Sequence, residues 1–295
     1  MRMDDQEESQ NIQDDRGSTG GFRPIHGISL GTLAVALIGG WLLGINPLTI
    51  LGLLSGGGVS APQSTSQSAP SQPYVGSPQE EAQKKFVSQI LRSTETVWST
   101  ALQERGQSYQ PTTLVLYRGG DRTACGEGEA AAGPFYCPND RKVYLDLSFF
   151  DLMTQQLGAP GQFAHAYVVA HEVGHHVQNL LGILGRVDER RQRGSEAQAN
   201  ALSVRLELQA DCLAGVWATR SQSQQHGWHL DQGDVATALQ AASQIGDDTL
   251  QKRSRGVVVP ESFTHGTSAQ RVSWFKRGVD SGQIDSCDTF AAAQL

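Results

Sequence analysis

Residues 166–180 read AYVVAHEVGHHVQNL and place three of the chain's eight histidines within six positions of an apolar run. If the run is helical, Val169, Val173 and Val177 share one face at a spacing of four residues, which is typical of a buried stripe. His171 and His175 are also four residues apart, so they project together from another face of the helix. The stretch therefore predicts a buried helix that presents two imidazoles side by side.

The letters HEVGH within this run match the H-E-x-x-H pattern, in which two histidines bind zinc and the glutamate acts as a general base. Glu172 lies about 100° round the helix from His171, where its carboxylate can reach the open side of a bound ion. A catalytic zinc requires three protein ligands and one free position for water. His171 and His175 supply two of them, and the residues directly after them lack the further histidine found in metzincins.

The third ligand is expected from residues 199–218, ANALSVRLELQADCLAGVWA. Glu207 and Asp211 are four residues apart and share one face of the predicted helix. A carboxylate that binds the metal, followed one turn later by an aspartate that orients a histidine ligand, is a common arrangement around zinc. We therefore assign Glu207 to Zn2+ and Asp211 to a ring N–H of His171.

Several longer motifs carry a family resemblance: GPFYCPNDRKVYLDLSFF, AHEVGHHVQ, ELQADCLAGVWA, FTHGTSAQRVSWF and CDTF. With these motifs the chain resembles the bacterial family called "putative neutral zinc metallopeptidases", which are single-pass membrane proteins. The resemblance covers nearly the whole chain. It implies an α+β, zincin-like fold of the gluzincin type, in which the H-E-x-x-H helix and the glutamate helix pack across the metal beside a small β-sheet.

The periodicity of apolar residues predicts the elements of this domain. Helices are expected over residues 80–104, 162–184, 195–220 and 233–252, and strands over residues 112–120 and 142–150. The charged segment 186–198 between the two ligand helices is expected to be a solvated loop, with a lid over the site as the alternative. A small sheet beside a helical body is an α+β arrangement.

The N-terminal part of the chain predicts a membrane anchor. No charged residue lies between Arg23 and Glu80, and residues 28–54 are mostly apolar. A helix of this length would span roughly 40 Å, more than the ~30 Å of a bilayer core. Because the bases Arg16 and Arg23 precede the span, the N-terminus is expected in the cytoplasm. A cleaved signal peptide is the alternative.

These boundaries give four regions: a cytoplasmic tail of residues 1–27, a transmembrane helix of residues 28–54, a flexible linker of residues 55–79 and a zinc metallopeptidase-like domain of residues 80–295. The expected location is the bacterial inner membrane, with the catalytic domain outside the cytoplasm. The linker is rich in Ser, Gly, Pro and Gln, as flexible tethers are.

The net charge and the cysteines narrow the class of protein further. The formal net charge of −7, without a basic stripe, gives no support for a nucleic-acid partner. The four cysteines form no C-x-x-C motif, so two disulfides are favoured, as expected of an exported domain. Cys125 and Cys137 form a plausible local pair. For Cys212, a bridge to Cys287 is favoured over a role as a fourth zinc ligand.

The expected function is a membrane-anchored zinc metallopeptidase that hydrolyses peptide bonds of peptide or protein substrates with zinc-activated water and Glu172 as general base. His265 is the first candidate for stabilising the oxyanion, with Tyr144 and Arg271 as alternatives. His165 and His176 lie off the ligand face and are not expected to bind metal.

The strand KVYLDL, residues 142–147, is expected to be the sheet edge on which an extended substrate pairs. Two other functions stay open: a zinc amidase that acts on cell-wall peptides, and a non-catalytic binding domain that contains zinc.

Overall fold

The computed structural model describes residues 6–17, 74–129, 133–155, 161–222, 233–244, 246–255 and 257–295.

Within these residues, a small mixed sheet of four strands lies at one side of the fold. The strand order is β1-β2-β6-β5, with β1 at Ile12–Asp14, β2 at Thr113–Tyr117, β6 at Lys142–Asp146 and β5 at Phe135–Cys137. Strands β1, β2 and β6 are parallel, whereas β5 pairs antiparallel with β6. A separate hairpin joins β3 (Gly120–Thr123) and β4 (Gly126–Glu129).

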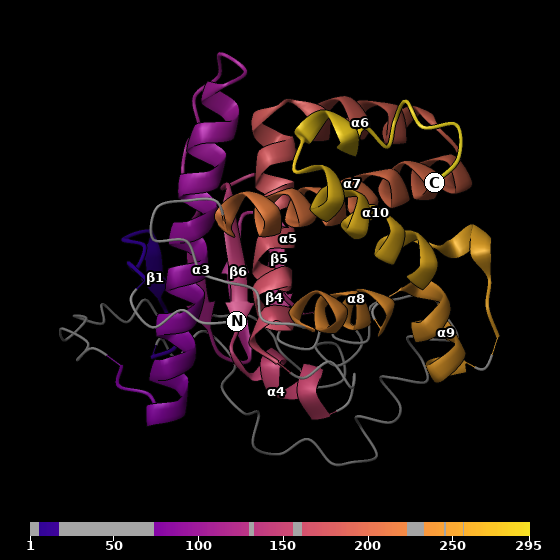
Figure 1. The fold of residues 1–295 in the computed structure, drawn as a ribbon. Coiled ribbons are helices and arrows are strands. Elements are labelled where there is room, and N and C mark those ends of the chain that lie inside the picture. The colour runs from indigo at the N-terminus through magenta and orange to yellow at the C-terminus, as the bar shows by residue number, and fades with distance from the viewer. Residues whose placement is uncertain are drawn as a thin grey trace, which may run out of the picture. The chain divides into compact units, whose positions relative to one another are not determined.

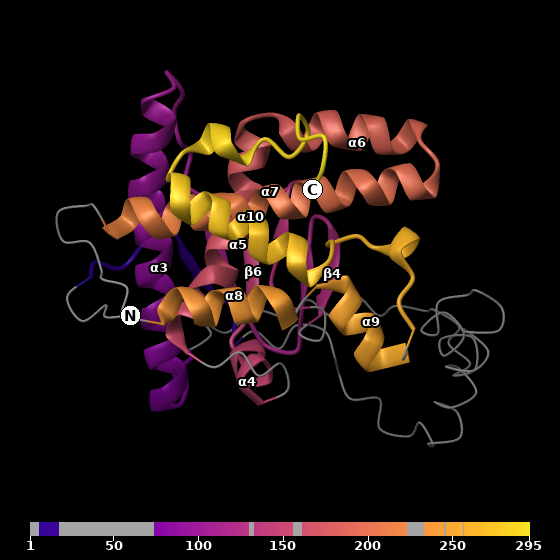
Figure 2. The same cartoon turned by 45° about the vertical axis from the view of Figure 1, so that its right-hand side comes forward.

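The helices form a larger body next to this sheet, as Figure 1 shows. They are α3 (Pro78–Gln103), α4 (Ser148–Gln155), α5 (Gln162–Leu180), α6 (Ile183–Arg193), α7 (Glu196–Gln222), α8 (Asp234–Gln244), α9 (Asp247–Arg255) and α10 (Ser268–Ser281), with short 3-10 turns η2 (Pro260–Ser262) and η3 (Ile284–Cys287). In Figure 2, α6 and α10 run alongside α7, and α7 also packs on α5. The expected α+β class is therefore confirmed, with most of the described residues in helices.

Glycines allow the close approach of the helices around α7. A Cβ atom on Gly278 of α10 would lie 1.9 Å from the carbonyl oxygen of Cys212, and one on Gly215 of α7 would lie 2.2 Å from that of Phe275. No side chain fits at such distances, so the two backbones touch directly. The contact brings the C-terminal half of α10 against α7 at Cys212 and Gly215.

Two of the predicted helices are each two helices in the structure. The helix expected over residues 162–184 ends at Leu180, and Gly182 turns the chain in the left-handed conformation (φ 67°) into α6. The prediction of a solvated loop over residues 186–198 was therefore wrong, because most of it is helical. The helix expected over residues 233–252 is interrupted near Gly246, where a Cβ would lie 2.4 Å from the amide nitrogen of Ser268.

The strands differ from the prediction at the sheet edge. The strand expected over residues 142–150 ends at Asp146, and α4 begins two residues later. Strand β6 lies between β2 and β5, so both of its edges are hydrogen-bonded and the prediction of a free edge there was wrong. The short strand β5, which the sequence pattern did not reveal, is the outer strand on that side of the described sheet.

Both expected disulfides are present. Cys125 is bonded to Cys137, and Cys212 on α7 is bonded to Cys287 in η3. The sulfur of Cys212 is therefore committed to a disulfide and is not a fourth metal ligand. The second bridge ties the C-terminal segment to the centre of the helical body across 75 residues of sequence.

The N-terminal residues 6–17 belong to the same compact unit as residues 74–295. Strand β1 adds to the sheet beside β2, and Arg16 follows it with 4 % of its surface exposed. The Arg16 guanidinium donates to Asp14 at 2.8 and 2.7 Å and to Glu81 of α3 at 2.8 Å. Lys84 of α3 also pairs with Asp14 at 2.7 Å. These ion pairs attach the N-terminal segment to the start of α3.

The membrane predictions fall largely outside the described residues. This applies to the expected transmembrane helix of residues 28–54 and to the linker up to residue 73, while α3 already begins at Pro78. Within the described ranges, no helix has the length and hydropathy needed to cross a bilayer. The structure pairs β1 with β2, whereas a single crossing between them would place the two strands in different compartments. The single-pass arrangement stays a prediction, and the stability of this pairing in the native protein tests it.

Replacing Arg16 by alanine should destabilise the full-length chain if β1 pairs with β2 in the native protein. The change removes the bonds to Asp14 and Glu81, so we expect a loss of about 1–2 kcal/mol, or a thermal midpoint lower by roughly 2–6 °C. Calorimetry of purified protein measures it, with Arg193→Ala at an exposed position of α6 as control. An unchanged midpoint in Arg16→Ala would favour the single crossing.

The ion pair between Asp14 and Arg16 should make the destabilisation in Arg16→Ala depend on pH. Burial disfavours the Asp14 carboxylate, but its bonds to Arg16 and Lys84 outweigh burial and lower its pKa. A carboxyl group whose pKa is depressed by folding stabilises the fold above its unfolded pKa of about 4, and this contribution is lost as the pH falls below it. The difference between wild type and Arg16→Ala should therefore shrink in acid.

Candidate metal centre

Three donor side chains from two helices meet in one place. His171 Nε2 on α5 lies 3.2 Å from Glu207 Oε2 on α7, and His175 Nε2 lies 3.5 Å from Glu207 Oε1. One donor atom from each residue falls within 4.8 Å of the other two. In a tetrahedral zinc site with bonds of about 2.0–2.1 Å, neighbouring donor atoms are about 3.3 Å apart. The donor set and its spacing therefore fit a single zinc ion.

The packing of α5 against α7 produces this convergence. Val169, Val173 and Val177 are each at most 1 % exposed and bury the face of α5 opposite the histidines. Gly174 lies against α7, and a Cβ there would be only 3.1 Å from the carbonyl oxygen of Ala210. Because Gly174 lies between the two histidines in sequence, the helices approach most closely at the level of the donors.

His171 is oriented by a buried carboxylate. Its Nδ1 lies 2.8 Å from Asp211 Oδ1, so the Nδ1 hydrogen is donated to Asp211 and Nε2 faces Glu207. Asp211 has no exposed surface and also accepts a 2.5 Å hydrogen bond from the Tyr167 hydroxyl. Such a partner sets both the tautomer and the ring plane of a metal-binding histidine.

Arg271 of α10 balances the charge of Asp211. Its Nε and one terminal nitrogen donate to the two Asp211 oxygens, each at 2.9 Å, in the bidentate geometry that suits a carboxylate. Burial disfavours the carboxylate of Asp211, but the charges of Arg271 and His171 hold its pKa below the usual range. Loss of either partner would leave an uncompensated charge in the protein interior.

The charges of the cluster suit a cation. Burial opposes protonation of both imidazoles, but Asp211 and Glu207 raise the pKa of His171 to about 10, and Glu207 raises that of His175. Burial likewise opposes ionisation of Glu207, yet the two histidines lower its pKa well below the usual value. The site thus attracts positive charge, and a divalent ion would replace protons there.

Glu172 lines the same cleft and has no partner of its own. Its side chain makes no hydrogen bond or ion pair within the described part of the chain, and 8 % of its surface is exposed. Burial raises the pKa of its carboxyl group above the ordinary glutamate value. A buried carboxylate with a raised pKa beside a metal site is suited to accept and return a proton.

His265 lies at the margin of the cleft, with about half of its side chain exposed. Its Nδ1 is 3.2 Å from Asp247 Oδ1 at the start of α9. The other oxygen, Asp247 Oδ2, accepts the backbone N–H groups of Thr264, His265 and Gly266 at 2.8, 2.6 and 3.0 Å. Asp247 therefore fixes the loop and directs Nε2 of His265 away from itself.

The cleft that joins these groups has a volume of about 660 Å³. One wall is formed by β5 and the residues before it, and the metal donors come from α5 and α7. Apolar side chains supply much of the remaining lining: Phe135, Phe149, Leu152, Val168, Leu184, Leu206 and Leu250. A cleft of this size, with a few polar groups in apolar walls, is typical of a substrate site.

Other residues considered from the sequence take different places. Tyr144 donates to Asp140 at 2.7 Å and is absent from the cleft lining, which excludes it as an oxyanion donor. His176 is held between the Tyr136 hydroxyl and the backbone carbonyl of Gln110 at 3.0 and 2.6 Å. His165 stacks on Phe150 with ring centroids 4.1 Å apart. None of the three faces the metal donors.

Sequence reasoning missed two features of this site. It gave no role to Asp247, which lies 18 residues before His265 and shares no pattern with it. It also considered Arg271 as an oxyanion donor, whereas the structure places its guanidinium on Asp211. The only signal for Arg271 was its presence in the motif FTHGTSAQRVSWF.

Replacing Asp211 by asparagine should weaken zinc binding. The amide keeps the shape but removes the charge that orients His171 and balances Arg271, so we expect an affinity about 10- to 100-fold lower. Competition with a chromophoric chelator measures it. Asp146→Asn, which changes another buried carboxylate that accepts backbone N–H groups, is the matched control and should bind zinc as the wild type does. Equal affinities for all three proteins would exclude this role of Asp211.

The family that matches the chain is described as zinc-dependent, in agreement with a donor set that fits zinc. A family described as "Putative neutral zinc metallopeptidase" matches residues 1–290. The uncharacterized protein YpfJ of Escherichia coli K12 is 49 % identical over 298 residues, which is 98 % of this chain and 99 % of that protein. The uncharacterized protein Rv2575 of Mycobacterium tuberculosis H37Rv is 43 % identical over 211 residues, 69 % of each chain. No solved structure matches the chain.

Proposed function

Since the chain belongs to the family of "putative neutral zinc metallopeptidases", we propose that it is a zinc-dependent peptidase of the gluzincin type that hydrolyses peptide bonds in peptides or proteins. The observation that carries the proposal is the convergence of His171, His175 and Glu207 beside an unpartnered, buried Glu172. Two imidazoles and one carboxylate leave a position free for water, as catalytic zinc sites require.

Zinc, when bound, would polarise the carbonyl of the scissile bond and make water a stronger acid. The chain itself supplies the proton transfers. Glu172 takes a proton from the attacking water and gives it to the leaving amine, for which its raised pKa is suited. Because Glu172 follows the first ligand directly in sequence, α5 holds the base and both histidine ligands on one rigid element, while Glu207 comes from α7.

His265 is suited to stabilise the oxyanion that develops on the substrate. It lies on the same cleft as the donors, and its Nδ1–H is directed to Asp247, so in the protonated ring the Nε2–H is available to the substrate. A preorganised donor of this kind typically accounts for about 10²- to 10³-fold in rate. Asp247 acts as a positioning residue through His265.

The edge of the sheet offers a binding mode for the substrate backbone. The edge strand on this side is β5 and not β6, which the sequence pattern indicates. β5 borders the cleft and is paired on one side only within the described sheet. An extended peptide that adds to β5 would pass the metal donors, with alternate side chains directed into the apolar lining. This favours substrates with large apolar residues near the cleaved bond.

The two disulfides support a location outside the cytoplasm, because such bonds persist in oxidising compartments. We therefore propose that the domain works in the bacterial cell envelope.

Mass spectrometry of protein isolated under alkylating conditions would find both cysteine pairs oxidised. Free thiols at Cys212 and Cys287 would contradict this location.

Replacing Glu172 by glutamine should abolish most of the activity while keeping the metal. Glutamine cannot accept the proton, so kcat on a peptide library should fall by about 10²- to 10⁴-fold. Zinc content and affinity should stay at the wild-type level, and Glu196→Gln at the exposed start of α7 serves as control. Full activity of Glu172→Gln would refute its role. Cleavage of muropeptides but of no library peptide would instead favour the cell-wall amidase.

The pair formed by Asp247 and His265 should determine how the activity falls at high pH. The hydrogen bond to Asp247 raises the pKa of His265 despite its partial burial, and only the protonated ring carries the Nε2–H that donates to an oxyanion. Activity should therefore fall as the pH rises through this raised pKa. In Asp247→Asn the pKa should return toward about 6.5, so the fall in activity moves to lower pH. Profiles of kcat that coincide for both proteins would exclude this role of the pair.

A further inference from the structure

The side chain of Gln178 occupies a defined position beside the second histidine ligand. It is fully buried on α5, three residues after His175. Its amide nitrogen donates to the backbone carbonyl of Leu206 at 2.8 Å and to Gln209 Oε1 at 3.1 Å. Since the nitrogen is engaged by two acceptors, the oxygen must be the atom that faces His175, where it lies 2.8 Å from Nδ1.

This contact determines which nitrogen of His175 is free. Because an amide oxygen only accepts, His175 carries its hydrogen on Nδ1 and donates it to Gln178. Nε2, which points toward Glu207, is then left with the lone pair that a metal requires. Gln178 thus does for His175 what Asp211 does for His171, with a neutral group in place of a charged one.

The chain of hydrogen bonds continues beyond Gln178 to the end of the protein. Gln209 on α7 accepts from Gln178 through its oxygen and donates through its nitrogen to the backbone carbonyl of Cys287 at 3.0 Å. Every donor and acceptor along this path has one possible assignment. Cys287 is in turn bonded to Cys212, and both cysteines are without exposed surface.

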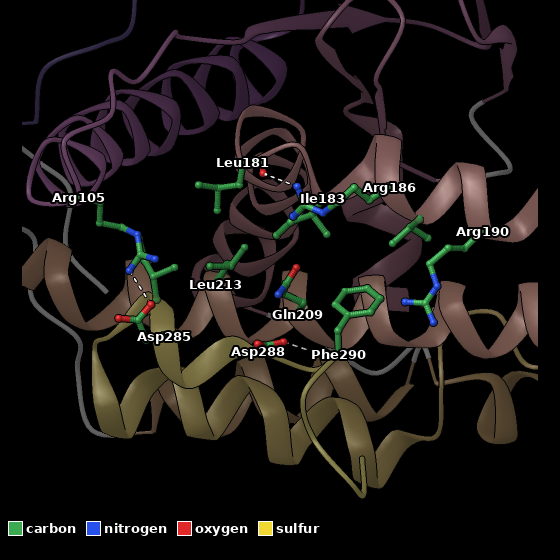
Figure 3. A pocket seen from close by; sticks show the side chains of 12 residues that line it. Arg105, Leu181, Ile183, Arg186, Arg190, Gln209, Leu213, Asp285, Asp288 and Phe290 are labelled. Atoms are coloured by element: carbon green, nitrogen blue, oxygen red, sulfur yellow. Dashed lines mark hydrogen bonds and ion pairs between the residues drawn. The ribbon is translucent and has the colours of Figure 1, made fainter.

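The C-terminal segment supplies the hydrogen-bond partner of the Gln209 amide nitrogen. Figure 3 shows the Gln209 side chain at a pocket between α6 and the residues from Asp285 to Phe290, and this pocket has a volume of about 520 Å³. The side chain is 6 % exposed, so it is buried beside the pocket. The carbonyl of Cys287 is the hydrogen-bond acceptor that orients its amide nitrogen. Thr289 fastens the same segment to α7, where its hydroxyl donates to the carbonyl of Arg205 at 2.7 Å.

We propose that the C-terminal segment, residues 284–290, is a positioning element of the metal centre. Through Cys287, Gln209 and Gln178 it holds the ring of His175 in the tautomer and orientation that bind zinc, and the disulfide to Cys212 fixes the outer end of this path. The proposal rests on the proposed function only in taking His175 as a zinc ligand.

Zinc affinity of the full-length chain, measured by chelator competition, tests the path. Gln178→Met should lower the affinity by about 10- to 100-fold, as expected for a partner of a histidine ligand, and Gln209→Met by a smaller factor of roughly 3 to 10. Gln89→Met is the matched control: this buried glutamine of α3 donates to the carbonyl of Gln6, so its loss should leave zinc affinity unchanged. Wild-type affinity in Gln178→Met, or an equal loss in Gln89→Met, would overturn the proposal.

A second pair of measurements separates positioning from general destabilisation. In metal-free protein with ¹⁵N-labelled histidine, at a pH at which the ring of His175 is neutral, NMR should show its proton on Nδ1 in the wild type and a mixture of tautomers in Gln178→Met. Removal of both cysteines, Cys212→Ala with Cys287→Ala, should lower zinc affinity in the wild-type background. It should have little further effect in the Gln209→Met background, because the path is already broken.

Equal effects of cysteine removal in the two backgrounds would show that the disulfide does not act through Gln209 and would overturn the proposal. None of these readouts involves peptide cleavage. A chain that shows the expected losses of affinity but cleaves no peptide would refute the proposed function and leave the positioning role in place.

Discussion

The buried ion pair of Asp211 and Arg271 is the interaction on which the rest of the site depends. Asp211 lies where α5, α7 and α10 meet, and it binds groups from both neighbouring helices: His171 and Tyr167 from α5 and Arg271 from α10. A buried charge without its partner is costly, so these helices can adopt only the arrangement in which all the bonds to Asp211 form. That arrangement also sets His171 opposite Glu207.

The two histidine ligands are held by different means. His171 depends on an ionic partner that three helices share, whereas His175 depends on neutral amides that end at the disulfide-bonded C-terminal segment. The residues proposed to act in hydrolysis also come from two kinds of structure. The proposed base and metal ligands lie on helices, while His265 and the β5 edge border the cleft from the loop after α9 and from the sheet. Hydrolysis of an extended chain by the proposed mechanism would require donors that are held rigidly and a cleft that admits the substrate.

Local sequence patterns predicted the parts of the site that lie within single helices. The spacing of four residues places His171 with His175 and Glu207 with Asp211 on shared helix faces, and the structure brings these faces together. The helix breaks at Gly182 and near Gly246 were missed because a helical apolar pattern continues across them, and the turn is set by tertiary contacts.

Contacts between distant segments that carry no recognisable motif were beyond the reach of these patterns. Strand β1 has only three residues, too few for a recognisable alternation, and its place in the sheet depends on β2, about a hundred residues away. The bonds from Asp247 to His265 and from Gln178 to Gln209 likewise join segments 18 and 31 residues apart. Common polar residues without a spacing rule carry no signal until the fold has placed them.

X-ray absorption at the zinc edge of the purified full-length protein tests the proposed donor set, because it reports the identity of the atoms around the metal. We expect one zinc per chain with nitrogen and oxygen neighbours at about 2.0–2.1 Å, a scattering pattern of two imidazoles, and the loss of one oxygen neighbour in Glu207→Ala. Sulfur at about 2.3 Å, or a spectrum that Glu207→Ala leaves unchanged, would contradict it.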